Sequence, residues 1–86
     1  MSAMFMVVTT EAEILAIVRE ALGAEAVGVT IESTRNDFET WDSLGHLAIL
    51  AALDEHFDGK VGDIKEIATT DSVRSILQIL RSHGLM

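Results

Sequence analysis

The sequence predicts an all-α protein, a small antiparallel bundle of three main helices and one short helix with a long loop between the first two main helices. Apolar residues recur at helical spacing in three stretches, and polar caps or glycines stand at the ends of these stretches. The chain contains no proline. The alternating apolar residues between 27 and 31 have no second strand to pair with, so a sheet is disfavoured. With 86 residues, the chain has room for one domain spanning residues 1–86.

The first helix begins after Thr10, which forms a T-x-x-E capping box with Glu13. Gly23 is the expected stop, because glycine accepts the left-handed backbone that often ends a helix. The apolar residues at helical spacing between these two points are Ile14, Leu15, Ile17, Val18, Ala21 and Leu22.

The next connection, residues 24–41, shows no sustained period and carries the turn-forming residues Gly28, Ser33, Asn36 and Asp37. We therefore expect a long ordered loop. Such a loop inside a compact domain needs apolar anchors. The candidate anchors are Val27, Val29, Ile31, Phe38 and Trp41.

The second main helix is expected to start at Asp42 or Ser43, with Asp42 as a favourable N-cap, and to run to Phe57. Its apolar residues are Leu44, Leu47, Ala48, Leu50, Ala51 and Leu53. Two glycines within residues 58–63 break the helix. The pattern predicts the most apolar helix of the chain.

A short helical turn over residues 63–68 and a final helix complete the prediction. Thr69 or Thr70 is expected to cap the final helix, and Gly84 is expected to end it. The apolar residues of this helix are Val73, Ile76, Leu77, Ile79 and Leu80.

The chain is strongly acidic, with 14 acidic and 6 basic residues and a formal net charge of -8. This charge repels nucleic acid and anionic membranes, favours partners with basic surfaces and opposes self-association, so we expect a monomer. Residues 1–8 are apolar but too short to span a membrane, and they lack the features of a secretory signal. We expect a cytoplasmic protein with a frayed segment 1–8, in which Phe5 or Val7 contacts the core.

The chain contains no cysteine, which excludes disulfides, cysteine-based zinc sites and any thiol chemistry of its own. Acidic residues gather around His56, in "DEHFDGKVGD", but they lack the ligand pattern of a calcium loop, and no spacing fits zinc. No metal site is therefore predicted.

Ser43 is the residue with the clearest potential for chemistry. Asp42 accepts hydrogen bonds from the free N–H groups of the first helical turn, and Ser43 then directs its hydroxyl outward. A phosphate on that oxygen would lie beside the positive end of the helix dipole. An isolated Asp-Ser pair is also a common helix start with no further role.

Two longer motifs extend this pattern. The stretch "DSLGHLAILAALDEHFDGKV", residues 42–61, and the stretch "IATTDSVRSILQIL", residues 67–80, resemble the acyl carrier protein family, which includes peptidyl and aminoacyl carrier domains. With the first helix, the resemblance covers residues 10–82. It implies that Ser43 carries a 4'-phosphopantetheine arm, attached as a phosphodiester by a phosphopantetheinyl transferase that uses coenzyme A and Mg²⁺.

The resemblance also implies the partners and their surface. The thiol of the arm would hold an acyl or aminoacyl group as a thioester, loaded by an adenylating ligase and passed to a downstream acyltransferase or synthase, while the carrier itself catalyses nothing. In the family, the second helix is a main recognition surface. The corresponding residues here are Leu44, Gly45, His46, Ala48, Asp54 and Glu55.

Several residues depart from the family pattern. The residues before Asp42 are "ETW" rather than a Leu-Gly pair, and Ala48 stands where fatty-acid carriers commonly have an acidic residue. Gly45 and His46 differ from the fatty-acid carriers as well. The stretch "WDSLGHL", residues 41–47, is more similar to stand-alone carriers of specialised pathways, which are loaded with amino acids or small hydroxy acids.

Two other functions are compatible with parts of the sequence. A cofactor-free acidic adaptor could bind a basic protein through the second helix. A hydrolase could use Ser43 with His46 as its base, because residues i and i+3 are neighbours on a helix. The hydrolase is disfavoured, because the surface of so small a bundle offers no evident pocket or oxyanion hole.

Overall fold

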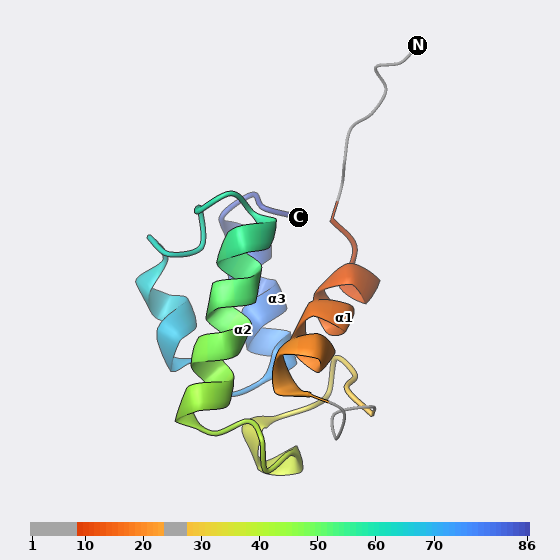
Figure 1. Ribbon diagram of the computed structural model, residues 1–86. Helices are drawn as coiled ribbons and strands as arrows, with labels where there is room; N and C mark the ends of the chain where they lie inside the picture. Colours follow the sequence, from red (N-terminus) through yellow and green to blue (C-terminus); the bar gives the residue numbers. More distant parts are fainter. Residues whose placement is uncertain (1–8, 24–27) are drawn as a thin grey trace.

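The computed structural model describes residues 9–23 and 28–86 (Figure 1). It contains the helices α1 (Glu11–Leu22), α2 (Ser43–His56) and α3 (Val73–Ser82) and two 3-10 helices, η2 (Arg35–Asp37) and η3 (Lys65–Thr69). Within these residues there is no strand, only one isolated bridge between Thr34 and Ser72. The all-α prediction is confirmed, whereas the expectations for residues 1–8, with Phe5 and Val7, and for Val27 lie outside the described residues.

Helix α1 starts and stops where the sequence predicts. The Thr10 hydroxyl accepts from the Glu13 N–H at 3.2 Å, and the Glu13 carboxylate accepts from the Thr10 N–H at 2.9 Å, which completes the capping box. At the other end, Gly23 has a φ of 93° and its N–H donates to the Arg19 carbonyl. The buried side of the helix consists of Ile14, Val18 and Leu22, which are four residues apart.

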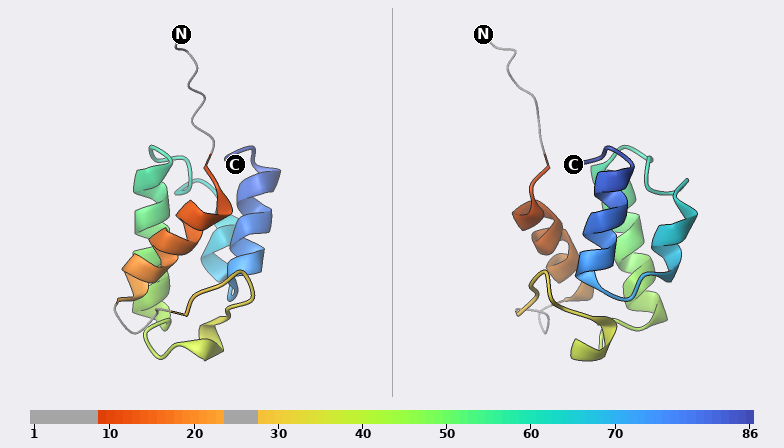
Figure 2. Two further views of the ribbon diagram at one scale, coloured as in Figure 1. Left: turned by 90° about the vertical axis from the view of Figure 1, so that its right-hand side faces the viewer. Right: turned by 180° about the vertical axis from the view of Figure 1, so that it is seen from behind.

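The directions of the helices correct part of the prediction. Thr9 lies against His56, with 3.2 Å between Oγ1 and Nε2, and Glu11 forms an ion pair with Arg81. The start of α1 is therefore beside the ends of α2 and α3, so α1 is antiparallel to both. Helices α2 and α3 run in the same direction (Figures 1 and 2). The expectation of an antiparallel bundle was therefore wrong for α2 and α3, because residues 57–72 return along the molecule through η3 before α3 begins.

One hydrophobic core joins the three α-helices, η3 and the loop before α2. Its largest member is Trp41, which is only 2% exposed and comes from the loop rather than from a helix. The other buried apolar residues come from the three helices, from η3 and from the connection before η3. They are Ile14, Val18, Leu22, Ile49, Leu53, Phe57, Val61, Ile64, Ile67, Val73, Ile76, Leu77 and Leu80.

The N-cap of α3 differs from the prediction. Ser72 caps the helix by accepting from the Ser75 N–H at 3.1 Å. Thr69 instead ends η3, and Thr70 is buried with its hydroxyl donating to the Ile67 carbonyl at 2.9 Å. The expectation that Thr69 or Thr70 caps α3 was wrong, because η3 runs to Thr69 with Thr70 as its C-cap, and the last helix starts later.

The C-terminus of α3 agrees with the prediction that Gly84 ends it. Gly84 has a φ of 73°, its N–H donates to the Arg81 carbonyl, and the next N–H, of Leu85, donates to the Leu80 carbonyl. This pair of bonds satisfies two of the carbonyls that the end of a helix leaves free.

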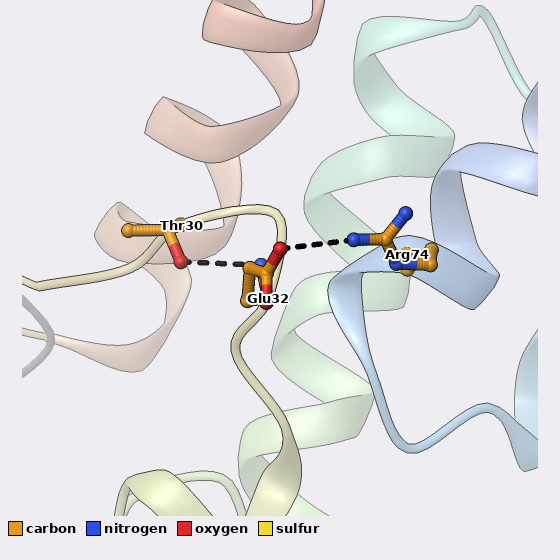
Figure 3. Close-up of polar contacts among 3 residues, drawn as sticks. All are labelled: Thr30, Glu32 and Arg74. Carbon is orange, nitrogen blue, oxygen red and sulfur yellow. Dashed lines mark hydrogen bonds and ion pairs between the residues drawn. The ribbon is translucent and has the colours of Figure 1, made fainter.

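The loop before α2 is tied to the start of α3. The Arg35 N–H donates to the Asp71 carbonyl at 2.9 Å, and the Val73 N–H donates to the Ser33 carbonyl at 3.0 Å. On the surface, Arg74 forms a 3.1 Å ion pair with Glu32, whose N–H is held by the Thr30 hydroxyl (Figure 3). The predicted anchors among the described residues pack on the core: Val29, Ile31 and Phe38 in part and Trp41 fully.

Helices long and apolar enough to cross a membrane are absent from the part of the chain that the structure describes. The longest described helix, α2, has 14 residues.

Candidate functional site

Ser43 is the first residue of α2 and is exposed. Asp42 is the N-cap, as predicted, and its Oδ1 accepts from the Gly45 N–H at 2.8 Å. The first N–H groups of a helix have no partner within the helix, and Asp42 satisfies one of them. A negatively charged group on the Ser43 hydroxyl would therefore lie beside backbone donors and the positive end of the α2 dipole.

Two large apolar side chains stand exposed beside Ser43. Leu44 is 75% exposed and Leu47 is 60% exposed. The buried face of α2 is formed instead by His46, Ile49 and Leu53. The apolar spacing in the sequence therefore does not coincide with the buried face of this helix. Exposed leucines on neighbouring turns are a common feature of surfaces that bind another protein or an apolar group.

A hollow of about 310 Å³ opens next to Ser43. It lies between η2, α2 and η3, so segments far apart in the sequence contribute to it. Its lining consists of Arg35, Ser43, His46, Leu47, Leu50 and Ala68. The hollow thus combines a hydroxyl and a cation with an apolar wall.

His46 forms one wall of this hollow and corrects another prediction. It is only 4% exposed, so its expected place on the partner-facing surface was wrong. The Trp41 indole N–H donates to His46 Nδ1 at 3.1 Å, with the two ring planes within 14° of parallel. Nε2 lies 3.1 Å from the Ile67 carbonyl, to which it donates when Nδ1 acts as acceptor. The buried indole N–H needs an acceptor, and this requirement turns His46 inward.

The same contacts bear on a Ser43–His46 pair. Both imidazole nitrogens are occupied by partners in the loop and in η3. The ring can take a proton from the Ser43 hydroxyl only if one of these buried bonds is broken. In this arrangement His46 connects the start of α2 to η3 and is not placed as a general base.

Gly45 has a packing role that the sequence did not reveal. A Cβ atom at this position would lie 1.9 Å from the Thr40 carbonyl oxygen and 3.1 Å from the Leu22 side chain. The glycine therefore allows the loop backbone and the end of α1 to approach the first turn of α2 closely. This contact explains the residue without any partner protein.

The remaining predicted partner-facing residues are spread along α2. Ala48 is exposed, one turn from Leu44. Asp54 is half-buried and its Oδ1 accepts from the Gly62 N–H at 2.6 Å, whereas Glu55 is exposed. Asp54 is about 17 Å along the helix axis from Ser43, at 1.5 Å per residue. The structure thus gathers Asp42, Ser43, Leu44 and Gly45 at one end of α2 and leaves the two acidic residues at the other.

Four residues that line the hollow were not assigned to the site by the sequence analysis: Arg35, Leu47, Leu50 and Ala68. Arg35 belongs to no motif, and Ala68 lies in the motif of residues 67–80 but was given no role there. Both line the hollow with Ser43 only because the fold brings their segments to the start of α2. Leu47 could have been assigned to the site, because it lies four residues after Ser43 and so shares its face of the helix.

The site therefore offers an exposed hydroxyl at a capped helix start, an apolar rim and a half-buried cation. Comparisons of the chain with protein-family models, with curated proteins and with solved structures found no match. Support for a function comes from the residues around Ser43 and from the motifs of residues 42–61 and 67–80.

Proposed function

We propose that this chain is a carrier of acyl or aminoacyl groups, which it holds as thioesters on a 4'-phosphopantetheine arm attached to Ser43. The observation that carries the proposal is the position of Ser43, exposed as the first residue of α2 and directly after the N-cap Asp42. The resemblance of residues 42–61 and 67–80 to acyl carrier proteins supports the same role.

The proposed attachment is a simple transfer. The Ser43 hydroxyl oxygen forms a bond to the pantetheine-linked phosphorus of coenzyme A, the pyrophosphate bond breaks, and adenosine 3',5'-bisphosphate leaves. The hydroxyl proton passes to a base of the transferase, and Mg²⁺ neutralises the phosphates. The exposure of Ser43 suits this step, because a second protein must reach the oxygen.

The arm would supply chemistry that the chain lacks. With no cysteine, the protein has no thiol of its own. The arm ends in a thiol, so an adenylating ligase could load it with an acyl or aminoacyl group. A downstream acyltransferase or synthase would then take that group, while the carrier itself performs no catalysis.

The exposed side of α2 is the proposed surface for these partners. Leu44, Leu47 and Ala48 form its apolar part beside Ser43. Glu55 offers an acidic contact farther along the helix. Asp54 offers one only through Oδ2, because its Oδ1 accepts from the Gly62 N–H. Exposed ion pairs contribute about 0.2–1 kcal/mol each, so these acids would steer basic partners more than hold them.

The proposed setting is a monomeric cytoplasmic carrier of a specialised pathway. The departures from the fatty-acid carriers at Gly45, His46 and Ala48 favour amino acids or small hydroxy acids as the load. The contacts of Gly45 and His46 show that two of these departures also serve packing. The load is therefore best identified by offering the thiol form to different adenylating ligases and measuring thioester formation by mass.

Intact-mass spectrometry tests the attachment directly. The purified unmodified chain is incubated with coenzyme A, Mg²⁺ and a broad-specificity phosphopantetheinyl transferase. We expect a mass increase of one phosphopantetheine group, located at Ser43 by fragmentation. Ser43→Ala should abolish the increase. Ser82→Ala, which removes an exposed serine of α3, should leave it unchanged.

An unchanged mass, in a reaction that modifies a known carrier protein, would refute the proposal. The alternative would then be a cofactor-free acidic adaptor that binds a basic protein through the exposed side of α2. An arm found on a residue other than Ser43 would refute the assigned site.

A further inference from the structure

Arg35 is a half-buried cation in the lining of the hollow that contains Ser43. It belongs to η2, eight residues before Ser43. Its Nε donates to the Trp41 carbonyl at 3.3 Å, and its backbone N–H donates to the Asp71 carbonyl at 2.9 Å. These bonds fix the backbone and the Nε of Arg35. The two terminal amino groups of the guanidinium remain for another acceptor.

Arg35 differs from Arg74 and Arg81 in its charged neighbours. Arg74 forms an ion pair with Glu32 (Figure 3). Arg81 forms one with Glu11. Within residues 9–23 and 28–86, by contrast, no carboxylate lies at ion-pair distance from Arg35. The formal net charge of -8 makes acidic neighbours plentiful. A half-buried arginine that faces a hollow rather than a carboxylate is a suitable partner for an anion from outside the chain.

We propose that Arg35 binds the phosphodiester on Ser43 and holds the base of the arm over the hollow. This inference rests on the proposed function, because it requires the arm. A phosphodiester has two non-bridging oxygens that share one negative charge, and a guanidinium binds such a group through two parallel hydrogen bonds. The phosphate is attached directly to the Ser43 oxygen, so it must lie at the edge of the hollow that Arg35 lines.

The contact has an energetic consequence. Attaching the arm adds a negative charge to a chain that already carries a formal charge of -8, and without compensation the added repulsion would favour unfolding. Arg35 offsets this repulsion only in the folded state, where the loop brings it to Ser43. Little side-chain entropy is lost in forming the pair, because the Trp41 carbonyl already orients the guanidinium.

A thermodynamic cycle that combines substitution of Arg35 with attachment of the arm measures the coupling between Arg35 and the phosphate. The unfolding equilibrium constant is measured by urea titration for the unmodified and modified forms of the wild type and of Arg35→Gln. We expect the effect of modification on this constant to differ between the two by about five- to tenfold, between the values typical of exposed ion pairs and of charged hydrogen bonds. Arg35→Lys should keep part of the coupling, because it keeps the charge.

Arg74→Gln is the matched control. It removes an exposed arginine of α3 whose partner is Glu32, at a surface outside the lining of the hollow. We expect the same effect of modification as in the wild type, to within about twofold, which corresponds to the small contribution of an exposed pair. The coupling of Arg35 should also weaken as salt is added, because an ion pair is screened.

A measurement on the wild type covers the case in which Arg35→Gln does not fold. The Nε–H signals of the arginine side chains are compared by NMR before and after modification. Attachment of the arm should shift the Arg35 signal and leave the Arg74 signal in place.

The two proposals fail in different ways. A chain that accepts no arm refutes the carrier function and this inference together. A modified chain in which Arg35→Gln shows the wild-type effect of modification, or in which the Arg35 signal does not move, refutes the role of Arg35 alone.

Discussion

Substitution of Gly45 by alanine separates helix propensity from packing. In an open helical position alanine is more favourable than glycine by about 0.8–1.0 kcal/mol, so propensity alone predicts that Gly45→Ala stabilises the protein. The structure predicts the opposite. The new Cβ would lie 1.9 Å from the Thr40 carbonyl oxygen, and the obstacle is backbone that no rotamer change can remove. Either the loop or the first turn of α2 must move.

The expected size of the effect follows from these two terms. Forcing an extra carbon into a packed site costs about 1–3 kcal/mol, and a contact with backbone lies toward the upper end of that range. After subtraction of the propensity gain, we expect Gly45→Ala to lower the free energy of unfolding by about 1–2 kcal/mol. The midpoint of thermal unfolding should fall by roughly 4–8 °C for each kcal/mol.

Urea unfolding followed by far-UV circular dichroism is the assay, and Ala48→Gly is the control. Ala48 is exposed in the same helix, so replacing it by glycine should cost about 0.8–1.0 kcal/mol from propensity alone. At position 45 the protein with glycine should therefore be more stable than the protein with alanine. At position 48 the order should be reversed. A Gly45→Ala protein as stable as the wild type, or more stable, would show that the close approach of the loop to α2 is not as the structure has it.

Three further substitutions, two of them paired with a control, test the start and the buried face of α2. His46→Leu leaves the Trp41 indole N–H without an acceptor and should cost about 1–3 kcal/mol in urea unfolding followed by tryptophan fluorescence, whereas unchanged stability would contradict the buried bond. Asp42→Ala should cost about 0.5–2 kcal/mol through loss of the N-cap, with Asp42→Asn close to the wild type in the same titration. Leu53→Ala should cost about 2–5 kcal/mol because Leu53 is fully buried, while Leu47→Ala, at a 60% exposed residue, should change stability by no more than about 0.5 kcal/mol. Similar costs for the two leucines would mean that the buried face of α2 has been misassigned.

The local features of this fold were predictable because their causes are local. The capping box of Thr10 with Glu13, the N-cap at Asp42 and the glycine at the end of α3 each depend on bonds between residues a few positions apart. The exposure of Ser43 follows from the same short-range geometry. The loop anchor Trp41 was predictable for a different reason, since a large apolar side chain in a long loop must be buried somewhere.

The role of His46 could not be derived in this way. Histidine is compatible with an exposed helical face, and its spacing from Ser43 even suggested a catalytic pair. Its burial depends on the Trp41 indole N–H and the Ile67 carbonyl, which converge on the ring from the loop and from η3. The apolar pattern around it was also ambiguous, because a run that contains Leu44 and Leu47 besides the buried residues permits several rotations of the helix.

The amino-acid sequence by itself determined the helical class, the ends of α1, the place of Ser43 at the start of α2, and the negative charge. These properties depend on composition and on contacts within about one helical turn. The tertiary structure decided that α2 and α3 run in the same direction, which face of α2 is buried, and that Arg35 and Ser43 line the same hollow. These properties depend on how residues 28–42 and 57–72 pack on the helices, and contacts between segments so far apart along the chain leave no periodic signal in either segment alone.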